Sequence, residues 1–456
     1  MIVAKFGGTS VGNAEAIEQA AAIIAARVPR QPLVVVSALA GTTNALITIA
    51  EQAASGQVIL AMRGVETLRE RHLSVAARLL ADPDVLSEVS AELSATFDEL
   101  AQLAEALFVL GHATPRSVDI IASKGELLSS TLVVAAFGAR GIPADLVSPM
   151  EIMITGDQFG RAEPLPERIA LRAAEVVRPL LSRGRVPVVG GFVGATEQGV
   201  VTTLGRGGSD YSASLFGAAL GADAIEIWTD VDGMLTADPR IVPGARLIER
   251  IRFDEASELA SFGAKVLHPS TIAPAVRVGI PVSILNARRP EGPGTLIAFD
   301  APTRPVTAIA GKTGVTVVRV GSARMLLAHG FLARIFEVFD RHRTSVDVVA
   351  TSEISVSLTI DDPRHLDALV PDLSLLGTVT VERNRGIVAL VGAGLGTDSA
   401  AMSRALGALS GMRVHMLSLS ASGINLTMLI DEDQVAPAIR NLHAAFFGTH
   451  DGGVET

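Results

Sequence analysis

The run Ile2-Val3-Ala4-Lys5-Phe6-Gly7-Gly8-Thr9-Ser10-Val11 sets the architecture that we expect for this chain of 456 residues. Its first five residues are nearly all apolar, which is typical of a strand buried on both faces. Two glycines follow where the chain must turn. Asn13 is then a good N-cap for an Ala- and Ile-rich helix that we expect to reach Arg27. A strand, a glycine loop and a helix in this order begin an α/β fold.

Similar apolar runs recur through the first 300 residues, separated by Ala-rich helical stretches. The further strand candidates are Leu33–Ser37, Val186–Val189, Ala224–Thr229 and Pro281–Leu285. Such strands predict an α/β fold with a mostly parallel central sheet between two helical layers, a three-layer αβα sandwich. The stretch from Glu51 to Leu110 is rich in Ala, Leu, Glu and Arg and predicts a helical insertion, with Asp82-Pro83-Asp84 as a turn between helices.

The C-terminal part contains an internal repeat. Prolines and glycines gather between Arg288 and Pro305, which we take as a domain boundary. Beyond it, Thr351–Asp362 aligns with Ser420–Glu432, and each copy reads as strand, helix, strand, strand, helix. We therefore expect a large domain over residues 1–300 and two small α+β domains over 301–385 and 386–456, either consecutive or nested.

Composition and charge narrow the class of protein. The chain has 38 Lys and Arg against 48 Asp and Glu, a net charge of −10 without a basic cluster, which argues against binding nucleic acid or an anionic membrane. The absence of cysteine excludes disulfides, thiolate nucleophiles and Cys-based metal sites. We expect no targeting peptide and a cytoplasmic location. The charge-free run Gln31–Ala50 contains Gly41-Thr42-Thr43-Asn44, so we interpret it as strand, loop and helix rather than a membrane span.

Two glycine-rich junctions between a strand and a helix are candidate phosphate sites. In the first, Lys5 precedes Gly7 and Gly8, an order that differs from the P-loop motif. The second is Gly205-Arg206-Gly207-Gly208-Ser209-Asp210, at the start of an Ala-rich helix. Backbone N–H groups at such junctions bind anions, and a nearby cation adds to the attraction. A tight turn and a capped flexible loop are the alternatives, while Asp210 could cap the helix or hold a lysine or Mg²⁺.

Two further segments carry polar residues near expected helix or strand ends. Trp228–Arg240 leaves a strand at the sheet edge where α/β folds bind ligands, although a surface turn would read the same way. In Ser123–Ser129, Glu126 could receive a substrate ammonium group, or it could simply complement a helix dipole in a first turn. The histidines, including His112, His268 and His329, lack metal-ligand spacing, so we expect no protein-held metal.

The motifs KFGGTSV, SALAGTTN, SKGELLSS, GRGGSDYSAS, WTDVDGMLTADPR and FGAKVLHPST resemble those of the aspartokinases of the amino acid kinase superfamily, in the same order. The resemblance covers essentially the whole chain, and the C-terminal repeat is similar to tandem ACT domains of ferredoxin-like fold. The length resembles that of the monofunctional enzymes. Met325, HGFLARIF and SVDVVATSEISVSLTID are most similar to the lysine-inhibited class.

The resemblance implies transfer of the ATP γ-phosphoryl group to the side-chain carboxylate of L-aspartate, with Mg²⁺ carried on the nucleotide. It implies that Lys5, Gly7 and Gly8 stabilise the transferred phosphoryl group and that Asp210 orients Lys5. Arg206 would pair with the substrate α-carboxylate and Glu126 with its ammonium. Other substrate positions are Thr43 and Ser209. The implied nucleotide positions are Lys5, Gly8, Thr229, Asp230, Leu235, Arg240, Lys265 and Val266. Leu235 stands where many relatives have tyrosine.

The resemblance also implies regulation and assembly. Lysine would bind between paired ACT domains, with threonine or no effector as alternatives, and the ACT domains would form a homodimer or larger oligomer. The effector positions would be Met325, Phe331, Leu332, Ser345, Val346, Asp347, Ser352 and Glu353. Other readings are a kinase for glutamate, acetylglutamate or UMP, and a catalytically silent amino-acid sensor. Glu126 with Arg206 favours a free α-amino acid, and the presence of Lys5, Arg206 and Asp210 disfavours the silent sensor.

Overall fold

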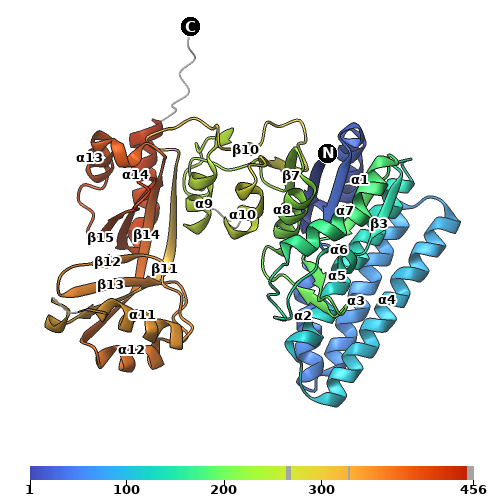
Figure 1. Ribbon diagram of the computed structural model, residues 1–456, viewed down its shortest axis with the longest axis horizontal. Coiled ribbons are helices and arrows are strands. Elements are labelled where there is room, and N and C mark those ends of the chain that lie inside the picture. The colour runs from blue at the N-terminus through green and yellow to red at the C-terminus, as the bar shows by residue number, and fades with distance from the viewer. Residues whose placement is uncertain (263–268, 327–328, 449–456) are drawn as a thin grey trace, which may run out of the picture. The chain divides into compact units, whose positions relative to one another are not determined.

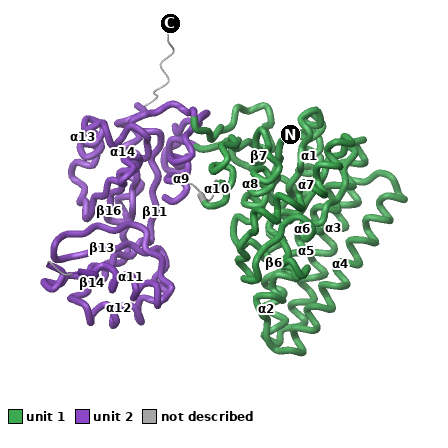
Figure 2. The backbone as a smooth tube through the Cα atoms, in the orientation of Figure 1, with its two compact units in different colours: residues 1–234, 266–299 green, residues 235–265, 300–456 purple. Residues whose placement is uncertain are grey.

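The computed structural model describes residues 1–262, 269–326 and 329–448. The chain divides into two compact units (Figure 2): unit 1 holds Met1–Met234 and Val266–Phe299, and unit 2 holds Leu235–Lys265 and Asp300–Thr456. Residues 235–262 therefore pack with the C-terminal part, although they precede the Pro- and Gly-rich stretch that we expected as the boundary. The domain limits 1–300, 301–385 and 386–456 stay a prediction, because the two compact units follow from contacts between residues and do not correspond to these three ranges.

The part of the central sheet that belongs to unit 1 forms from the five apolar runs that the sequence predicts, together with two shorter strands. In spatial order, its strands are β3 (Ala144–Val147), β4 (Val186–Gly190), β2 (Pro32–Val36), β1 (Ile2–Phe6), β7 (Ala224–Thr229), β9 (Val282–Asn286) and β10 (Thr295–Ile297). Of these strands, β3, β7 and β10 are labelled in Figure 1. The pairs from β3 to β9 are parallel, and β10 runs antiparallel to β9. A separate antiparallel pair is formed by β5 (Val193–Ala195) and β6 (Val201–Thr203).

Helices cover both faces of this sheet, which confirms the three-layer αβα class. The helices of unit 1 are α1 (Ala14–Ala25), α2 (Thr42–Ala54), α3 (Val58–Leu79), α4 (Pro83–Leu110), α5 (Pro115–Gly138), α6 (Pro149–Ile152), α7 (Pro166–Ser182), α8 (Gly208–Leu220) and α10 (Pro269–Arg277). The insertion predicted between Glu51 and Leu110 is the hairpin of α3 and α4, and Asp82 caps α4 by accepting from the backbone N–H groups of Asp84 and Val85.

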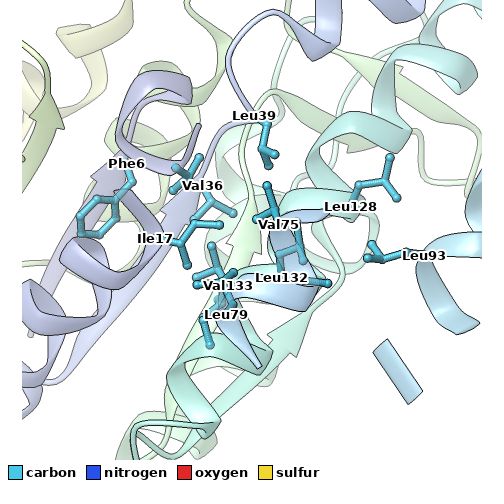
Figure 3. Close-up of a cluster of buried hydrophobic side chains, with 14 of the residues drawn as sticks. Phe6, Ile17, Val36, Leu39, Val75, Leu79, Leu93, Leu128, Leu132 and Val133 are labelled. Atoms are coloured by element: carbon cyan, nitrogen blue, oxygen red, sulfur yellow. The ribbon is translucent and has the colours of Figure 1, made fainter. Parts of the chain in front are cut away.

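The core of unit 1 explains the layering. Successive side chains of a strand point to opposite faces. Phe6 and Val36 pack with side chains of α1, α3 and α5 in one cluster (Figure 3), while Val3 lies by Gly217 of α8 on the other face. Helix α5 is long and apolar enough for a membrane span, but 67% of its most apolar window is buried within the protein. Such burial is typical of the central helix of a folded core.

Unit 2 repeats the predicted strand–helix–strand–strand–helix order twice. Its elements are β8 (Arg250–Ile251), α9 (Phe253–Ser261), β11 (Ala308–Gly321), α11 (Phe331–Arg341), β12 (Val349–Thr351), β13 (Ser355–Ile360), α12 (Leu366–Ser374), β14 (Thr378–Val391), α13 (Ser399–Ala408), β15 (Val414–Leu419), β16 (Asn425–Asp431) and α14 (Val435–Phe447). The strand order of its six-stranded sheet is β12-β13-β11-β14-β16-β15, and the neighbours are antiparallel.

Two hydrophobic cores lie on this sheet, and strands β11 and β14 contribute to both. The first half of β11 pairs with the second half of β14, and the register shifts after Lys312. Ile309 packs in the core with α13 and α14, whereas Val318 packs in the core with α11 and α12. The first α+β unit is thus inserted after the first strand of the second.

Candidate active site

A cavity of about 560 Å³ lies in unit 1 at the carboxyl end of β1. This is the sheet edge at which open α/β folds bind ligands. The cavity is lined by most of the residues that the sequence singled out for substrate and catalysis: Lys5, Thr43, Glu126, Arg206, Ser209 and Asp210. They come from β1, α2, α5 and the loop that leads into α8. The fold therefore brings together side chains that are up to 205 residues apart in the sequence.

Lys5 and Asp210 form an ion pair in the wall of this cavity. The Nζ atom of Lys5 lies 2.6 Å from Oδ1 of Asp210, and the two side chains are 9% and 18% exposed. Lys5 points to the α8 face because the side chains of β1 alternate, and Asp210 lies in the first turn of α8. An unpaired charge in a buried strand is energetically costly. The Asp210 carboxylate therefore compensates the positive charge of Lys5 at this position.

The two glycines after β1 have different structural roles. The backbone N–H of Gly7 donates to the carbonyl oxygen of Trp228 at 3.0 Å and so ties β1 to the end of β7. The N–H group of Gly7 therefore already has a hydrogen-bond acceptor. This contact does not support our expectation that the same N–H binds the transferred phosphoryl group. A Cβ atom at Gly8 would lie 2.9 Å from the carbonyl oxygen of Ala38, so close packing requires glycine there.

The second glycine motif turns directly into helix α8. Gly205 and Gly207 adopt φ angles of +78° and +72°, which favour glycine. Helix α8 then begins at Gly208, so its first N–H groups point out of the helix end beside the cavity. Arg206 is exposed, and within the described part of the chain no ion pair forms on its guanidinium. A free arginine beside a helix N-terminus is well suited to bind a carboxylate or phosphate.

Glu126 is a buried carboxylate with one unoccupied oxygen. Its residue is 3% exposed, and Oε1 accepts a hydrogen bond from the backbone N–H of Ala38 at 3.2 Å. Oε2 has no hydrogen-bond partner among the described residues. Burial raises the pKa of Glu126 to about 8. Since α5 begins at Pro115, Glu126 lies in mid-helix, and our alternative of a first-turn carboxylate is wrong. A group of this kind suits a cationic ligand.

The candidate nucleotide residues divide among several places. Thr229 and Asp230 line a second cavity of about 350 Å³ in unit 1, with Ser10 and Arg288 among its other residues. It lies where β1, β7 and β9 end. In unit 2, Leu235 forms a β-bridge with Leu247, and the exposed Arg240 pairs with Asp238 at 2.6 Å. The candidates Lys265 and Val266 lie outside the described residues.

Two residues of these cavities were missed by the sequence analysis. Asp119 is buried in α5 and lines the larger cavity, on the same helix face as Glu126 two turns later. The available signal was its spacing of two helical turns from Glu126, which places both carboxylates on one face of a helix. Arg288 lines the smaller cavity and follows β9 at the same sheet edge as Thr229. The sequence analysis did not consider Arg288 as a ligand-binding residue, because it lies in the stretch that we interpreted only as a domain boundary.

The candidate effector residues all belong to the first α+β unit. Phe331 is buried at the start of α11, and Met325 and Val346 pack against the same core. The Asp347 carboxylate lies 3.1 Å from Nζ of Lys312, so it already has a cationic partner. The remaining candidates are partly or largely exposed: Leu332, Ser345, Ser352 and Glu353.

Comparison with known proteins agrees with this architecture. Residues 1–286 match the model of the amino acid kinase family, and residues 388–446 match an ACT domain model. The chain is 37% identical to lysine-sensitive aspartokinase 3 of Escherichia coli K12, over 98% of this chain and 99% of that protein.

The solved structures give the same result. E. coli aspartokinase III in complex with aspartate and ADP, in its R-state, superposes with a TM-score of 0.85 at 37% identity, over 98% of this chain and 100% of that one. The T-state structure of the same enzyme with lysine and aspartate gives a TM-score of 0.81, over 98% of this chain and 99% of that one. The fold, the nested α+β pair and this similarity over the full length lead to one conclusion: the chain belongs to the amino acid kinase family and, within it, to the aspartokinases.

Proposed function

We propose that this protein is an aspartate kinase, which transfers the γ-phosphoryl group of ATP to the side-chain carboxylate of L-aspartate and yields 4-phospho-L-aspartate and ADP. The observation that carries the proposal is the cavity of about 560 Å³, in which the Lys5–Asp210 ion pair, the free arginine Arg206 and the buried carboxylate Glu126 meet. The E. coli relative, solved with aspartate and ADP, supports the same assignment.

The cavity offers complementary charges to a free α-amino acid. In this proposal Arg206 binds the α-carboxylate, for which a guanidinium provides two parallel donors. Glu126 receives the α-ammonium on its unoccupied Oε2. Thr43 and Ser209 help to position the substrate. An acetylated amine could not form the ion pair with Glu126, and a nucleotide would bring its phosphates toward a carboxylate. Both alternative substrates are therefore disfavoured.

Phosphoryl transfer then requires positioning and charge stabilisation rather than a general base. The side-chain carboxylate of aspartate is ionised at neutral pH, so an oxygen of it attacks the γ-phosphorus directly. The bond from that phosphorus to the bridging oxygen breaks, and ADP leaves with the electron pair. Lys5, with Gly8 beside it, would stabilise the negative charge on the transferred group, while Asp210 holds the Lys5 ammonium in place.

The nucleotide would use Thr229 and Asp230 at the second cavity, with Leu235, Arg240, Lys265 and Val266 as further proposed contacts. Mg²⁺ is proposed as the companion of ATP, and when bound it would neutralise charge on the phosphate oxygens. Across residues 1–262, 269–326 and 329–448, no cluster of three or more His, Asp or Glu side chains could hold a metal ion. Phosphate oxygens would thus supply most of its ligands, together with water.

Regulation by lysine is part of the proposal. The E. coli relative is called lysine-sensitive and has been solved with lysine bound. The effector would contact the residues around Phe331 and Asp347 in the first α+β unit, and a homodimer or larger homo-oligomer would form through the ACT domains. A cytoplasmic location and the branch of amino-acid biosynthesis served, whether lysine, threonine or methionine, belong to the same proposal.

Substrate selectivity tests the assignment. ADP release is measured with L-aspartate, L-glutamate, N-acetyl-L-aspartate and UMP as acceptors at equal concentration. We expect turnover with L-aspartate and loss of nearly all of it with N-acetyl-L-aspartate, because the ammonium that Glu126 receives is gone. A preference for N-acetyl-L-aspartate, L-glutamate or UMP over L-aspartate would contradict the proposal. If the protein releases no ADP with any of the four acceptors, the alternative of a catalytically silent amino-acid sensor would apply instead.

A further inference from the structure

Asp119 is a second buried carboxylate beside the substrate cavity, and its surroundings differ from those of Glu126. It lies in the second turn of α5 and is 2% exposed. Together with Ala122 and Glu126 it forms the face of α5 that lines the cavity. The helix thus presents two carboxylates to one cavity, and the proposed mechanism uses only one of them.

Both oxygens of Asp119 are occupied by protein donors. Oδ1 accepts from the hydroxyl of Thr203 at 2.7 Å, and Oδ2 accepts from the backbone N–H groups of Gly160 at 2.9 Å and Thr203 at 3.1 Å. Burial raises the pKa of Asp119, and these hydrogen bonds act in the opposite direction. Because both oxygens of Asp119 already accept from protein donors, Asp119 is less well placed to receive the substrate ammonium than Glu126, whose Oε2 has no partner among the described residues.

The two segments that Asp119 holds are those that flank the glycine motif before α8. Thr203 is the last residue of β6 and is followed, after Leu204, by Gly205. The backbone of Thr203 also accepts from the N–H of Ala162 at 2.8 Å. Gly160 and Gly205 are in close contact, since a Cβ atom at Gly205 would lie 3.2 Å from the carbonyl oxygen of Gly160. Asp119 therefore joins both segments to α5 at the point where the loop begins.

The glycine motif is thus anchored at both ends. The Lys5–Asp210 ion pair holds the end that enters α8. At the other end, within the described residues, Asp119 is the charged group that accepts hydrogen bonds from Thr203 and Gly160. Between the anchors lies Arg206, exposed and next to glycines with positive φ angles, a backbone with little intrinsic stiffness. Its guanidinium can meet a substrate reproducibly only if the loop is held from outside.

We propose that Asp119 is a positioning residue for substrate binding, which fixes the glycine motif Gly205–Asp210 so that Arg206 and Ser209 meet the α-carboxylate of aspartate. The inference rests on the proposed role of Arg206 in the aspartate kinase reaction. The two carboxylates of α5 then have different roles, because Glu126 binds the ligand directly, whereas Asp119 holds the loop that binds the other end of the ligand.

The test compares Asp119→Asn, which keeps the shape of the side chain, with Thr203→Val, which removes only the hydroxyl donor. The matched control is Asp145→Asn on β3 of the same unit, which weakens the ion pair with Arg185; neither residue lines either of the two cavities described above. For each variant, the KM for aspartate and for ATP, kcat and the melting temperature are measured. ADP affinity is followed through Trp228, the single tryptophan, next to Thr229.

Asp119→Asn should raise the KM for aspartate about tenfold or more, because hydrogen bonds to a buried charge are lost, while the KM for ATP and the ADP affinity change by less than about twofold. Thr203→Val should show a smaller rise in the same direction, and Asp145→Asn none. The inference is overturned if Asp119→Asn leaves the KM for aspartate unchanged. It is equally overturned if both KM values change together with a fall in melting temperature, the pattern of a merely structural residue. Failure of the wild-type chain to turn over aspartate would instead overturn the proposed function.

Discussion

Binding of aspartate should release a proton from Glu126. The carboxyl group is buried, and its pKa of about 8 means that about nine in ten molecules carry the proton at pH 7. An ammonium ligand requires the ionised form. Removing the proton at pH 7 costs about 1.4 kcal/mol, so the affinity for aspartate should rise roughly tenfold between pH 7 and pH values well above 8, and then level off.

Calorimetry measures this directly. Aspartate is titrated at pH 7 in two buffers whose ionisation enthalpies differ, and the difference in observed heat gives the number of protons released. We expect about 0.9 proton per bound aspartate in the wild type, and none in Glu126→Gln, whose KM for aspartate should be higher and independent of pH. Asp145→Asn is a control that should behave as the wild type. Absence of proton release together with a KM that is flat from pH 6.5 to 8.5 would refute the reasoning.

Three further results are expected. Lys5→Met should lower kcat about 10²-fold or more with ATP affinity largely kept, since the charge acts on the transferred group; near-normal kcat would remove Lys5 from that role. His72 is buried, and its pKa is lowered to about 4. Its contribution should make unit 1 less stable as the pH falls below 6.5, because His72 binds a proton in the unfolded chain but stays neutral in the folded one until about pH 4. Between pH 7 and 5, the free energy of unfolding, followed in urea by the fluorescence of Trp228, should fall by about 2 kcal/mol more in the wild type than in His72→Leu, since the raised pKa of Glu126 acts equally in both proteins; the same pH dependence in both would contradict it. Asp347→Asn should weaken inhibition by lysine without changing the KM for aspartate, as measured by lysine titration, and unchanged inhibition would remove Asp347 from the effector site.

Five strands of unit 1 could be predicted because they are largely buried and therefore read as short apolar runs, whereas the shorter β3, which is mostly not buried, could not. The pairing of Lys5 with Asp210 was expected from the family resemblance, because the strand before Asp210, β6, belongs to the separate β5–β6 pair rather than to the sheet that holds Lys5. Helix α5 shows the limit. Thr114 forms a capping box with Ser117, a signal present in the sequence, and overlooking it placed Glu126 in a first turn instead of mid-helix.

Other features depend on contacts that no local pattern contains. The hydrogen bonds of Asp119 join α5 to Gly160 and Thr203, which are distant in sequence and carry no motif of their own. Residues 235–262 pack with the rest of unit 2, where the buried Glu255 of α9 accepts from the hydroxyl of Thr307 and the N–H of Ala393. A composition shift marks a change of segment, but it does not reveal with which core a segment packs.

The most direct test of the account is the chemical identity of the product. The protein is incubated with ATP, Mg²⁺ and L-aspartate in the presence of hydroxylamine, which converts an acyl phosphate into a stable hydroxamate. We predict an aspartyl β-hydroxamate in amounts equal to the ADP formed, and its loss in Lys5→Met. ADP formed without hydroxamate, or a hydroxamate formed from L-glutamate but not from L-aspartate, would contradict the assignment of this cavity as an aspartate kinase site.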